Sequence, residues 1–322
     1  MLERHTDPEW WNRAVDVAIS SAMEFKAFTL FSLLFGIGIA IQAERAGAAG
    51  RRAEIFLLRR FLVLTGLGLI HLFVIWNGDI LTLYGVCGLL AIPFLRLRGR
   101  WMALAGAFCV LLPVVVSLPP GFPSADAIRA DASEAARVYG HGGFSEILGF
   151  RVRETRQLMG ALLIGVLPRT LGLMLIGGAV WKSGIILNPV RHRRSLLVAA
   201  PVLLVIGTVG SGDVAGNIPL AAGYGAAMLV WFSHRVPGGL AALGRMALTN
   251  YLVQSVVLGF IFYGYGFGLF DRLGSAVGVL IGIALYVAQI GFSVWWLGRF
   301  RFGPFEWLWR SLSYGRWQRL RV

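Results

Sequence analysis

Charge and cysteine are both scarce in this chain of 322 residues, of which only 14% are charged while 57% are hydrophobic. The two cysteines, Cys87 and Cys109, fall inside apolar runs, which excludes a disulfide framework and a metal site of the CxxC type, so no metal is expected. Residues 1–24 lack the short apolar segment of a cleavable signal peptide. The run GSGDVAG at 210–216 lacks the spacing of a dinucleotide-binding fingerprint. A separate soluble domain is excluded as well, because no connection between apolar runs is long enough to bury its own core.

What the chain has instead is a series of apolar runs that approach the length of about 20 residues with which a helix crosses a bilayer. We therefore predict an all-α, polytopic transmembrane helix bundle at 25–298, with the lipid bilayer as its partner. An interfacial segment (1–24) precedes this bundle, and a basic, aromatic cytoplasmic tail (299–322) follows it. The predicted spans are 25–44, 56–76, 80–97, 101–118, 158–181, 195–210, 218–232, 246–263 and 275–298.

The formal net charge of +14 fits a membrane topology better than a nucleic-acid site. If the connection at 45–60 is cytoplasmic, alternation of the spans places 20 of the 30 basic residues inside, as the positive-inside rule requires. These are Arg45, Arg51, Arg52, Arg59, Arg60, Arg96, Arg98, Arg100, Lys182, Arg191, Arg193, Arg194, Arg235, Arg245, Arg299, Arg301, Arg310, Arg316, Arg319 and Arg321. The C-terminus is therefore predicted to be cytoplasmic, and no nucleic acid is expected as a partner.

Two surface helices and one packing seam are predicted around these spans. Asp7-Pro8 begins an amphipathic helix suited to the outer leaflet. The outer loop at 119–157 contains an alanine-rich segment with interspersed charges, which predicts a short helix at 124–140 between glycine breaks. Glycines at every fourth position of 274–282 share one face, which predicts close packing of the last span.

The polar residues His71, Trp76 and Asp79 interrupt apolar sequence at a predicted helix-turn-helix junction. In an antiparallel hairpin His71 and Tyr84 share a depth in the membrane, while Trp76 and Asp79 flank the turn near the outer surface. An imidazole can act as a general base near neutral pH, and a carboxylate or phenol in hydrogen-bond reach can orient it. We therefore predict His71 and Asp79 as catalytic residues, with Trp76 and Tyr84 beside the substrate. The alternative is packing, in which His71 bonds a neighbouring helix and Asp79 caps the next one.

Arg169 lies near the centre of another predicted span, beside the kink-forming Pro168. An arginine there costs about 2.5–3.5 kcal/mol on insertion scales, so it is expected to face a wet cavity or a carboxylate rather than lipid. An anionic substrate group and Asp79 are the candidate partners. Arg169 is accordingly predicted to bind substrate.

A third polar cluster lies at the cytoplasmic start of the 246–263 span. Asn250 and Gln254 are four residues apart and share a helix face, with Arg245 at the basic membrane edge. Such a stripe suits either hydrogen bonding to a neighbouring helix or binding the phosphates of a cytoplasmic ligand.

These three segments, with FSLLFGIGIAIQAERA at 31–46, resemble the bacterial YeiB-like family of membrane proteins of unknown function (domain of unknown function 418), most specifically over 244–321. That family is similar to membrane acyltransferases that include the heparan-glucosaminide N-acetyltransferase and the sugar O-acyltransferases. The resemblance implies a bundle of about ten helices in the bacterial inner membrane. It would pass an acyl group from cytoplasmic acyl-CoA to an envelope glycan or lipid. Family members usually open with a helix bearing Leu-Arg-Gly, which residues before Phe25 do not match, so a truncated or alternatively started form is expected.

Three functional hypotheses follow. The leading one is a transmembrane acyltransferase with an essential outer-side histidine, for which His71 is the only histidine in a predicted span. In this hypothesis the hairpin residues and Arg169 surround an outer-facing cavity. The polar residues of 245–254 lie near the part of the site that binds coenzyme A. A transporter or channel would instead use Arg169 and the paired glycines for substrate passage. The third hypothesis is a non-catalytic envelope factor.

The topology can be tested directly. A reporter fused after Val322 is expected to be cytoplasmic, and cysteines placed at Asn77 or Gly212 are expected to react with an impermeant reagent from outside, because cations are so unequally divided between the alternating connections. Outside labelling of a cysteine placed at Arg51 would contradict this orientation.

Overall fold

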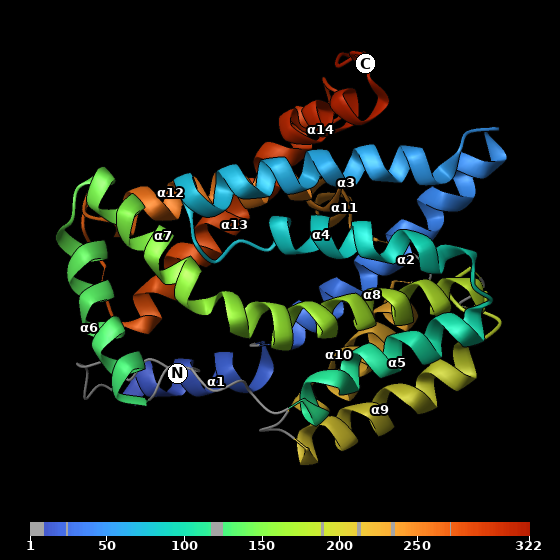
Figure 1. The fold of residues 1–322 in the computed structure, drawn as a ribbon, viewed down its shortest axis with the longest axis horizontal. Helices are drawn as coiled ribbons and strands as arrows, with labels where there is room; N and C mark the ends of the chain where they lie inside the picture. The colour runs from blue at the N-terminus through green and yellow to red at the C-terminus, as the bar shows by residue number, and fades with distance from the viewer. Residues whose placement is uncertain are drawn as a thin grey trace.

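The structure is a computed structural model that describes residues 10–23, 25–116, 125–187, 190–210, 214–232, 236–270 and 272–322. It is 81% helix, and no β-strand occurs in the part of the chain that it describes, so the all-α prediction is confirmed (Figure 1). The α-helices are α1 (Trp10–Ala22), α2 (Lys26–Ala48), α3 (Ala53–Ile70), α4 (Leu81–Ala91), α5 (Gly99–Val115), α6 (Ala125–His141), α7 (Phe144–Ala161), α8 (Leu167–Lys182), α9 (Arg193–Val209), α10 (Val214–Trp231), α11 (Gly238–Arg245), α12 (Ala247–Phe262), α13 (Ser275–Leu297) and α14 (Pro304–Tyr314). Two π-helical turns, η1 (His71–Ile75) and η3 (Leu162–Val166), extend α3 and join α7 to α8, and a 3-10 turn, η2 (Ile92–Arg96), ends α4.

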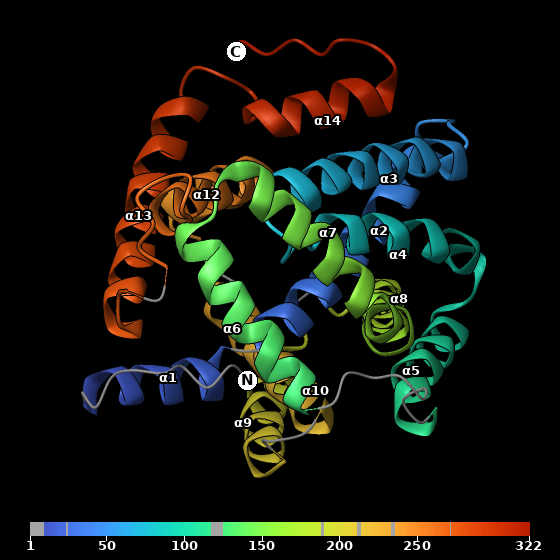
Figure 2. The ribbon, with the colours of Figure 1, turned by 60° about the vertical axis from the view of Figure 1, so that its left-hand side comes forward.

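Helix α8 is the centre of the bundle and packs against α2, α4 and α5. Figure 2 looks nearly along α8 and shows α4 and α5 on either side of it. Glycines allow these helices to approach to backbone contact: a Cβ on Gly36 of α2 would lie 1.9 Å from the Met174 carbonyl oxygen of α8. In the reverse direction, a Cβ on Gly177 would lie 2.0 Å from the Leu33 carbonyl oxygen. Close helix packing in this protein therefore depends on small residues, as is usual where lipid replaces water.

The glycine seam predicted at 274–282 is wrong for two of its three glycines. Gly274 meets α1, since a Cβ there would lie 2.5 Å from the Asn12 side-chain nitrogen. A Cβ added at Gly278 or Gly282 would meet nothing within 4 Å, so these glycines face open space. The spacing shows which residues share a helix face but not whether a neighbouring helix lies against that face.

Fewer helices can cross a membrane by length and composition than the nine spans that we predicted. Helices α4 and α5 are apolar but short of the about 20 residues that a bilayer core needs. Helix α11 meets α12 at an angle of 79°, as in a broken span or a re-entrant loop. The qualifying segments of the described chain are Trp10–Ala48, Ala53–Ile75, Phe144–Lys182 and Ser275–Leu297, with the bent pair α11–α12 as a fifth.

The outer loop is more helical than expected. The predicted short helix is confirmed as α6, although its preceding proline-rich residues lie outside the described part of the chain, as does the turn at 211–213. The predicted span 158–181 begins too late, because α7 continues through η3 into α8 to give one helical segment of 39 residues. Helix α1 packs against α13, where the Asn12 side-chain oxygen accepts a bond from the Ala276 amide (3.0 Å).

The C-terminal tail packs on the bundle as well as carrying charge. Helix α14 lies along α3 (Figure 1), where the Trp309 indole donates to the Arg60 carbonyl oxygen (2.9 Å) and the Arg60 guanidinium lies 3.5 Å from the Trp309 ring centre. Glu306 accepts the amide of Thr249 (2.9 Å) and its hydroxyl, which satisfies the first turn of α12. The tail thus fixes where α12 begins relative to α3.

The glycine contact between α2 and α8 gives a stability prediction. Gly36→Ala is expected to destabilise the protein by about 1–3 kcal/mol, because the added methyl group meets backbone that cannot rotate away. Gly38→Ala, two residues along α2, is the matched control: its Cβ would meet only the Gln42 amide, at 3.9 Å. Thermal unfolding of both variants in the same detergent measures the difference, and equal melting temperatures would contradict the packing described.

Candidate functional site

The candidate site is built where α3 ends and α4 begins. The last turn of α3 widens into η1, in which the Trp76 amide donates to the His71 carbonyl oxygen (2.8 Å) five residues earlier. Turns of this π type are rare and occur frequently at functional sites. The chain then reverses, and Gly68 lets α4 return in contact with α3, since a Cβ there would lie 2.3 Å from the Thr82 nitrogen.

Asp79 and His71 form a buried pair within this hairpin. His71 Nδ1 lies 2.8 Å from Asp79 Oδ1, and both side chains are 0% exposed. The Asp79 carboxylate also accepts the amides of Leu81 (3.1 Å) and Thr82 (2.7 Å), so it caps α4. Asp79 therefore caps α4 and pairs with His71 at the same time, because its two carboxylate oxygens together accept all three bonds.

The second imidazole nitrogen of His71 has no bond to a neighbouring helix. His71 Nε2 is buried and has no hydrogen-bond partner among the described residues. The Tyr251 ring lies against the imidazole at 4.9 Å between ring centres, and the Tyr251 hydroxyl accepts the Ile80 amide (3.4 Å). A buried nitrogen without a partner costs free energy, so this atom calls for an explanation beyond packing.

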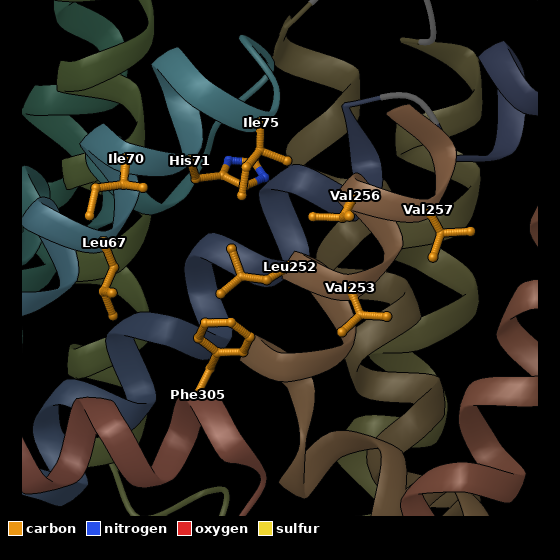
Figure 3. Close-up of a pocket in the computed structure, with 9 residues that line it drawn as sticks. All are labelled: Leu67, Ile70, His71, Ile75, Leu252, Val253, Val256, Val257 and Phe305. Atoms are coloured by element: carbon orange, nitrogen blue, oxygen red, sulfur yellow. The ribbon is translucent and has the colours of Figure 1, made fainter. Parts of the chain in front are cut away.

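His71 lines a cavity of about 200 Å³ between α3 and α12. Figure 3 shows its ring reaching across one end of this cavity from α3 toward α12, with Phe305 of α14 at the opposite end. The wall consists of Leu67, Ile70, His71 and Ile75 from α3 and η1, Leu252, Val253, Val256 and Val257 from α12, and Phe305. His71 is the one polar side chain among these lining residues. We call this space the His71 pocket.

Helices α6 and α7 cover the turn of the hairpin with residues that were not predicted as site residues. Asn77 at the turn donates to Glu154 of α7, which also accepts the Tyr139 hydroxyl (3.0 Å). Burial and the nearby Glu154 carboxylate raise the pKa of Tyr139, so its hydroxyl stays protonated and donates. The Arg151 side chain is fully buried and donates to the Val74 carbonyl oxygen (2.9 Å). The signal for these residues was weak: Arg151 and Glu154 are three apart and share a helix face, but nothing local pairs them with the hairpin.

Two residues predicted beside the substrate have different surroundings. Trp76 lies edge-on to the His71 ring, with 6.4 Å between ring centres. Tyr84 does not meet His71, because its hydroxyl bonds Ser32 of α2 (2.7 Å) and its ring stacks on Phe31. An antiparallel hairpin matches depths, but Tyr84 points toward α2, into the core.

Arg169 does not reach the hairpin pair in the described structure. Its guanidinium donates a long bond to the Thr29 hydroxyl of α2 (3.4 Å), while Asp79 is occupied by His71 and α4. Arg169 Nε is buried without a partner. Asp79 is therefore not the partner of Arg169, and an anionic substrate group remains as the predicted one.

The polar cluster that was predicted at the start of the 246–263 span separates into two parts. Asn250 donates to the Ser293 hydroxyl (3.1 Å) and its carbonyl oxygen accepts Gln289 (2.8 Å), so it pairs α12 with α13. Arg245 is exposed and donates to the Arg301 carbonyl oxygen (3.2 Å), and Gln254 is half-buried. Of the two alternatives, helix pairing is observed for Asn250, while Arg245 keeps a side chain that a phosphate can reach. No cluster of metal-ligating side chains occurs within the described ranges.

Comparison with known proteins places this architecture in a family. Residues 167–316 match the family model described as protein of unknown function (DUF418). YxaH of Bacillus subtilis (strain 168), an uncharacterised protein, is 34% identical over 344 residues, covering 96% of this chain and 85% of that protein. YeiB of Escherichia coli (strain K12), also uncharacterised, is 32% identical over 329 residues, covering 90% and 82%. The chain belongs to the DUF418 family.

The resemblance to the YeiB-like family is thereby confirmed. A third relative, an uncharacterised 39.9 kDa protein of the amylase 3' region of Bacillus acidopullulyticus, is 27% identical over 91% of this chain and 81% of its own length. No solved structure matches the chain. The names of these relatives state no activity, so function must be argued from the site itself.

The contact between α7 and the hairpin can be tested through Arg151. Arg151→Met is expected to lower the stability of the protein by about 1.5–3 kcal/mol, because it removes the charged donor of the Val74 carbonyl oxygen from a fully buried position. Arg153→Met is the matched control: this neighbour is exposed and pairs with Glu134 at the surface, where such pairs contribute about 0–1 kcal/mol. Thermal unfolding compares the two, and an Arg151→Met variant as stable as the control would mean that α7 does not hold the hairpin.

Proposed function

We propose that this protein is a multi-pass inner-membrane acyltransferase that moves an acyl group from cytoplasmic acyl-CoA to an envelope acceptor. The observation that supports this proposal is the buried His71–Asp79 pair, in which one imidazole nitrogen is held by a carboxylate and the other has no partner, on a ring that lines a cavity. An oriented imidazole with a free nitrogen is the arrangement of a general base.

The chemistry follows from how Asp79 holds the ring. A carboxylate that accepts from Nδ1–H fixes the neutral tautomer whose Nε2 carries a lone pair. His71 Nε2 would take the proton from an acceptor hydroxyl or amine as that atom bonds to the thioester carbonyl carbon. The carbon–sulfur bond then breaks, and the departing thiolate takes the proton from Nε2. Asp79 stabilises the imidazolium during the transfer, and its amide bonds from α4 keep it in place.

The residues at the cytoplasmic side fit the coenzyme only in part. Arg245 is exposed beside the arginine-rich tail, a suitable setting for phosphates. Asn250 is committed to Ser293, so its amide pairs helices and does not bind the coenzyme in this proposal. Gln254 and Arg169 stay in the proposal as residues that contact the coenzyme and an anionic substrate group, respectively.

The proposal includes nine crossings with a cytoplasmic C-terminus. The short helices α4, α5, α9, α10 and α12 would cross together with the longer ones, because buried neighbours and a locally thin bilayer can accommodate spans below the usual length. The division of arginines between the connections supports this orientation.

Exchange of the Asp79 carboxylate for an amide tests the proposed chemistry. Asp79→Asn keeps an oxygen that can cap α4 but presents an N–H group to His71 Nδ1, which forces the ring proton onto Nε2. We expect transfer to fall by about 1,000-fold or more, as the wrong tautomer does in hydrolase triads, with unchanged abundance and melting temperature. His71→Asn is expected to lower transfer at least as much.

The measurement uses inverted membrane vesicles that contain the protein and radiolabelled acetyl-CoA, with label followed on lipid, glycan and protein. His141→Asn is the matched control, because His141 is an exposed histidine outside the site. Wild-type transfer in both His71→Asn and Asp79→Asn would refute the proposal. Loss of transfer together with loss of the folded protein would assign the pair to packing.

A further inference from the structure

The His71 pocket opens sideways from the bundle. Its rim residues are exposed although they are apolar: Ile70 of α3 is 58% exposed, Val256 of α12 is 49% exposed and Val253 is 40% exposed. Ile70 belongs to the segment Ala53–Ile75, which is long and apolar enough to span a membrane. Exposed apolar side chains on a spanning segment face lipid tails, so the pocket opens toward the bilayer interior.

The size and lining of the pocket indicate what it can hold. Its volume of about 200 Å³ is below the range of about 300–1,000 Å³ that suits drug-sized ligands. A sugar there would leave its hydroxyl groups unpaired except for one that meets His71, and unpaired polar groups in such surroundings are costly. A linear alkyl chain has no such groups and matches a narrow apolar space.

Contacts described above cover two other sides of His71. On the outer side, Asn77 bonds Glu154 and Arg151 bonds the Val74 carbonyl oxygen. At the opposite end of the pocket, Phe305 belongs to α14, which Glu306 fastens to the first turn of α12. A ligand that comes from the bilayer therefore reaches the His71 end between α3 and α12.

We propose that the His71 pocket binds one alkyl chain of a bilayer lipid, and that this lipid is the acyl acceptor. The inference rests on the proposed function and deepens it, since it assigns the acceptor class. With the chain in the pocket, a hydroxyl or amine of the lipid lies at His71 Nε2, the one polar group of the lining. That group loses its proton to Nε2 and forms the new ester or amide bond, while the thioester carbon–sulfur bond breaks and the thiol leaves protonated.

The test measures binding and does not depend on turnover. The full chain is reconstituted in vesicles of phosphatidylethanolamine and phosphatidylglycerol that contain a trace of phosphatidylglycerol with a diazirine in mid-chain. After irradiation, mass spectrometry locates the cross-links. Labelling is expected to concentrate on the pocket faces of α3 and α12, roughly tenfold above the lipid-facing side of α13, where Val287 is 61% exposed. Labelling spread evenly over exposed apolar residues would overturn the proposal.

Two variants control for general lipid contact. Val256→Trp fills the pocket and is expected to reduce the pocket cross-links roughly tenfold, whereas Val287→Trp on the open face of α13 is expected to leave them unchanged. Both variants are checked for wild-type melting temperature, and Ile70→Trp, from the other wall, provides a second way to fill the pocket. Unchanged pocket labelling in a folded, filled variant would overturn the proposal.

A second arm identifies the source of the chain. Photoactivatable palmitoyl-CoA, added to the same vesicles without the labelled lipid, is expected not to label the pocket. Preferential labelling by palmitoyl-CoA would place the donor chain there and overturn the assignment to the acceptor. Pocket labelling by the phospholipid in a protein that transfers no acyl group would refute the proposed function alone, because the lipid site would stand without it. Transfer without pocket labelling would refute this inference alone.

Discussion

A single carboxylate, that of Asp79, joins the end of α3 to the start of α4. Its oxygens accept from the His71 ring and from the amides of Leu81 and Thr82, so the direction of the imidazole and the first turn of α4 depend on the same group. In water these bonds would compete with solvent, but at 0% exposure of both side chains they have no competitor. The buried pair therefore keeps one geometry, and the outer helices α6 and α7 and the pocket are arranged around it.

Local sequence was sufficient to predict the hairpin and its polar pair. A histidine and an aspartate lie on either side of an Asn-Gly turn in the sequence, which brings both to the same end of a hairpin, and an aspartate just before a helix caps it. Tyr84 shows the limit of this reasoning: matched depth did not give a shared face, because rotation about the helix axis directed it to Ser32. The partners of Asn77 and Val74 come from α7, about eighty residues away, and no local pattern encodes such pairing.

The apolar helices show the same difference between what local sequence predicts and what depends on contacts with distant segments. Apolar runs predicted helices in the right places, but helix length depends on features such as the π-turn through which α7 continues into α8 and the sharp bend between α11 and α12. Gly36 and Gly177 face the backbone of the neighbouring helix, while Gly278 and Gly282 of α13, with the clearer four-residue period, face open space. Periodicity is a property of one helix, and packing is a property of two. Likewise the tail had the composition of a surface anchor, yet Trp309 and Arg60 hold it to α3.

The π-turn at the end of α3 makes the site sensitive to chain length. In η1 the backbone bond spans five residues, so one more residue fits into the turn than an α-helix would hold. Removing one residue between His71 and Trp76 would restore the ordinary period and rotate whatever follows by about 100° about the helix axis. Asp79 would then approach His71 from another direction, although both side chains would be unchanged. Over evolutionary time this segment is thus expected to accept changes of residue type more readily than insertions or deletions, so that the number of residues from His71 to Asp79 carries information of its own.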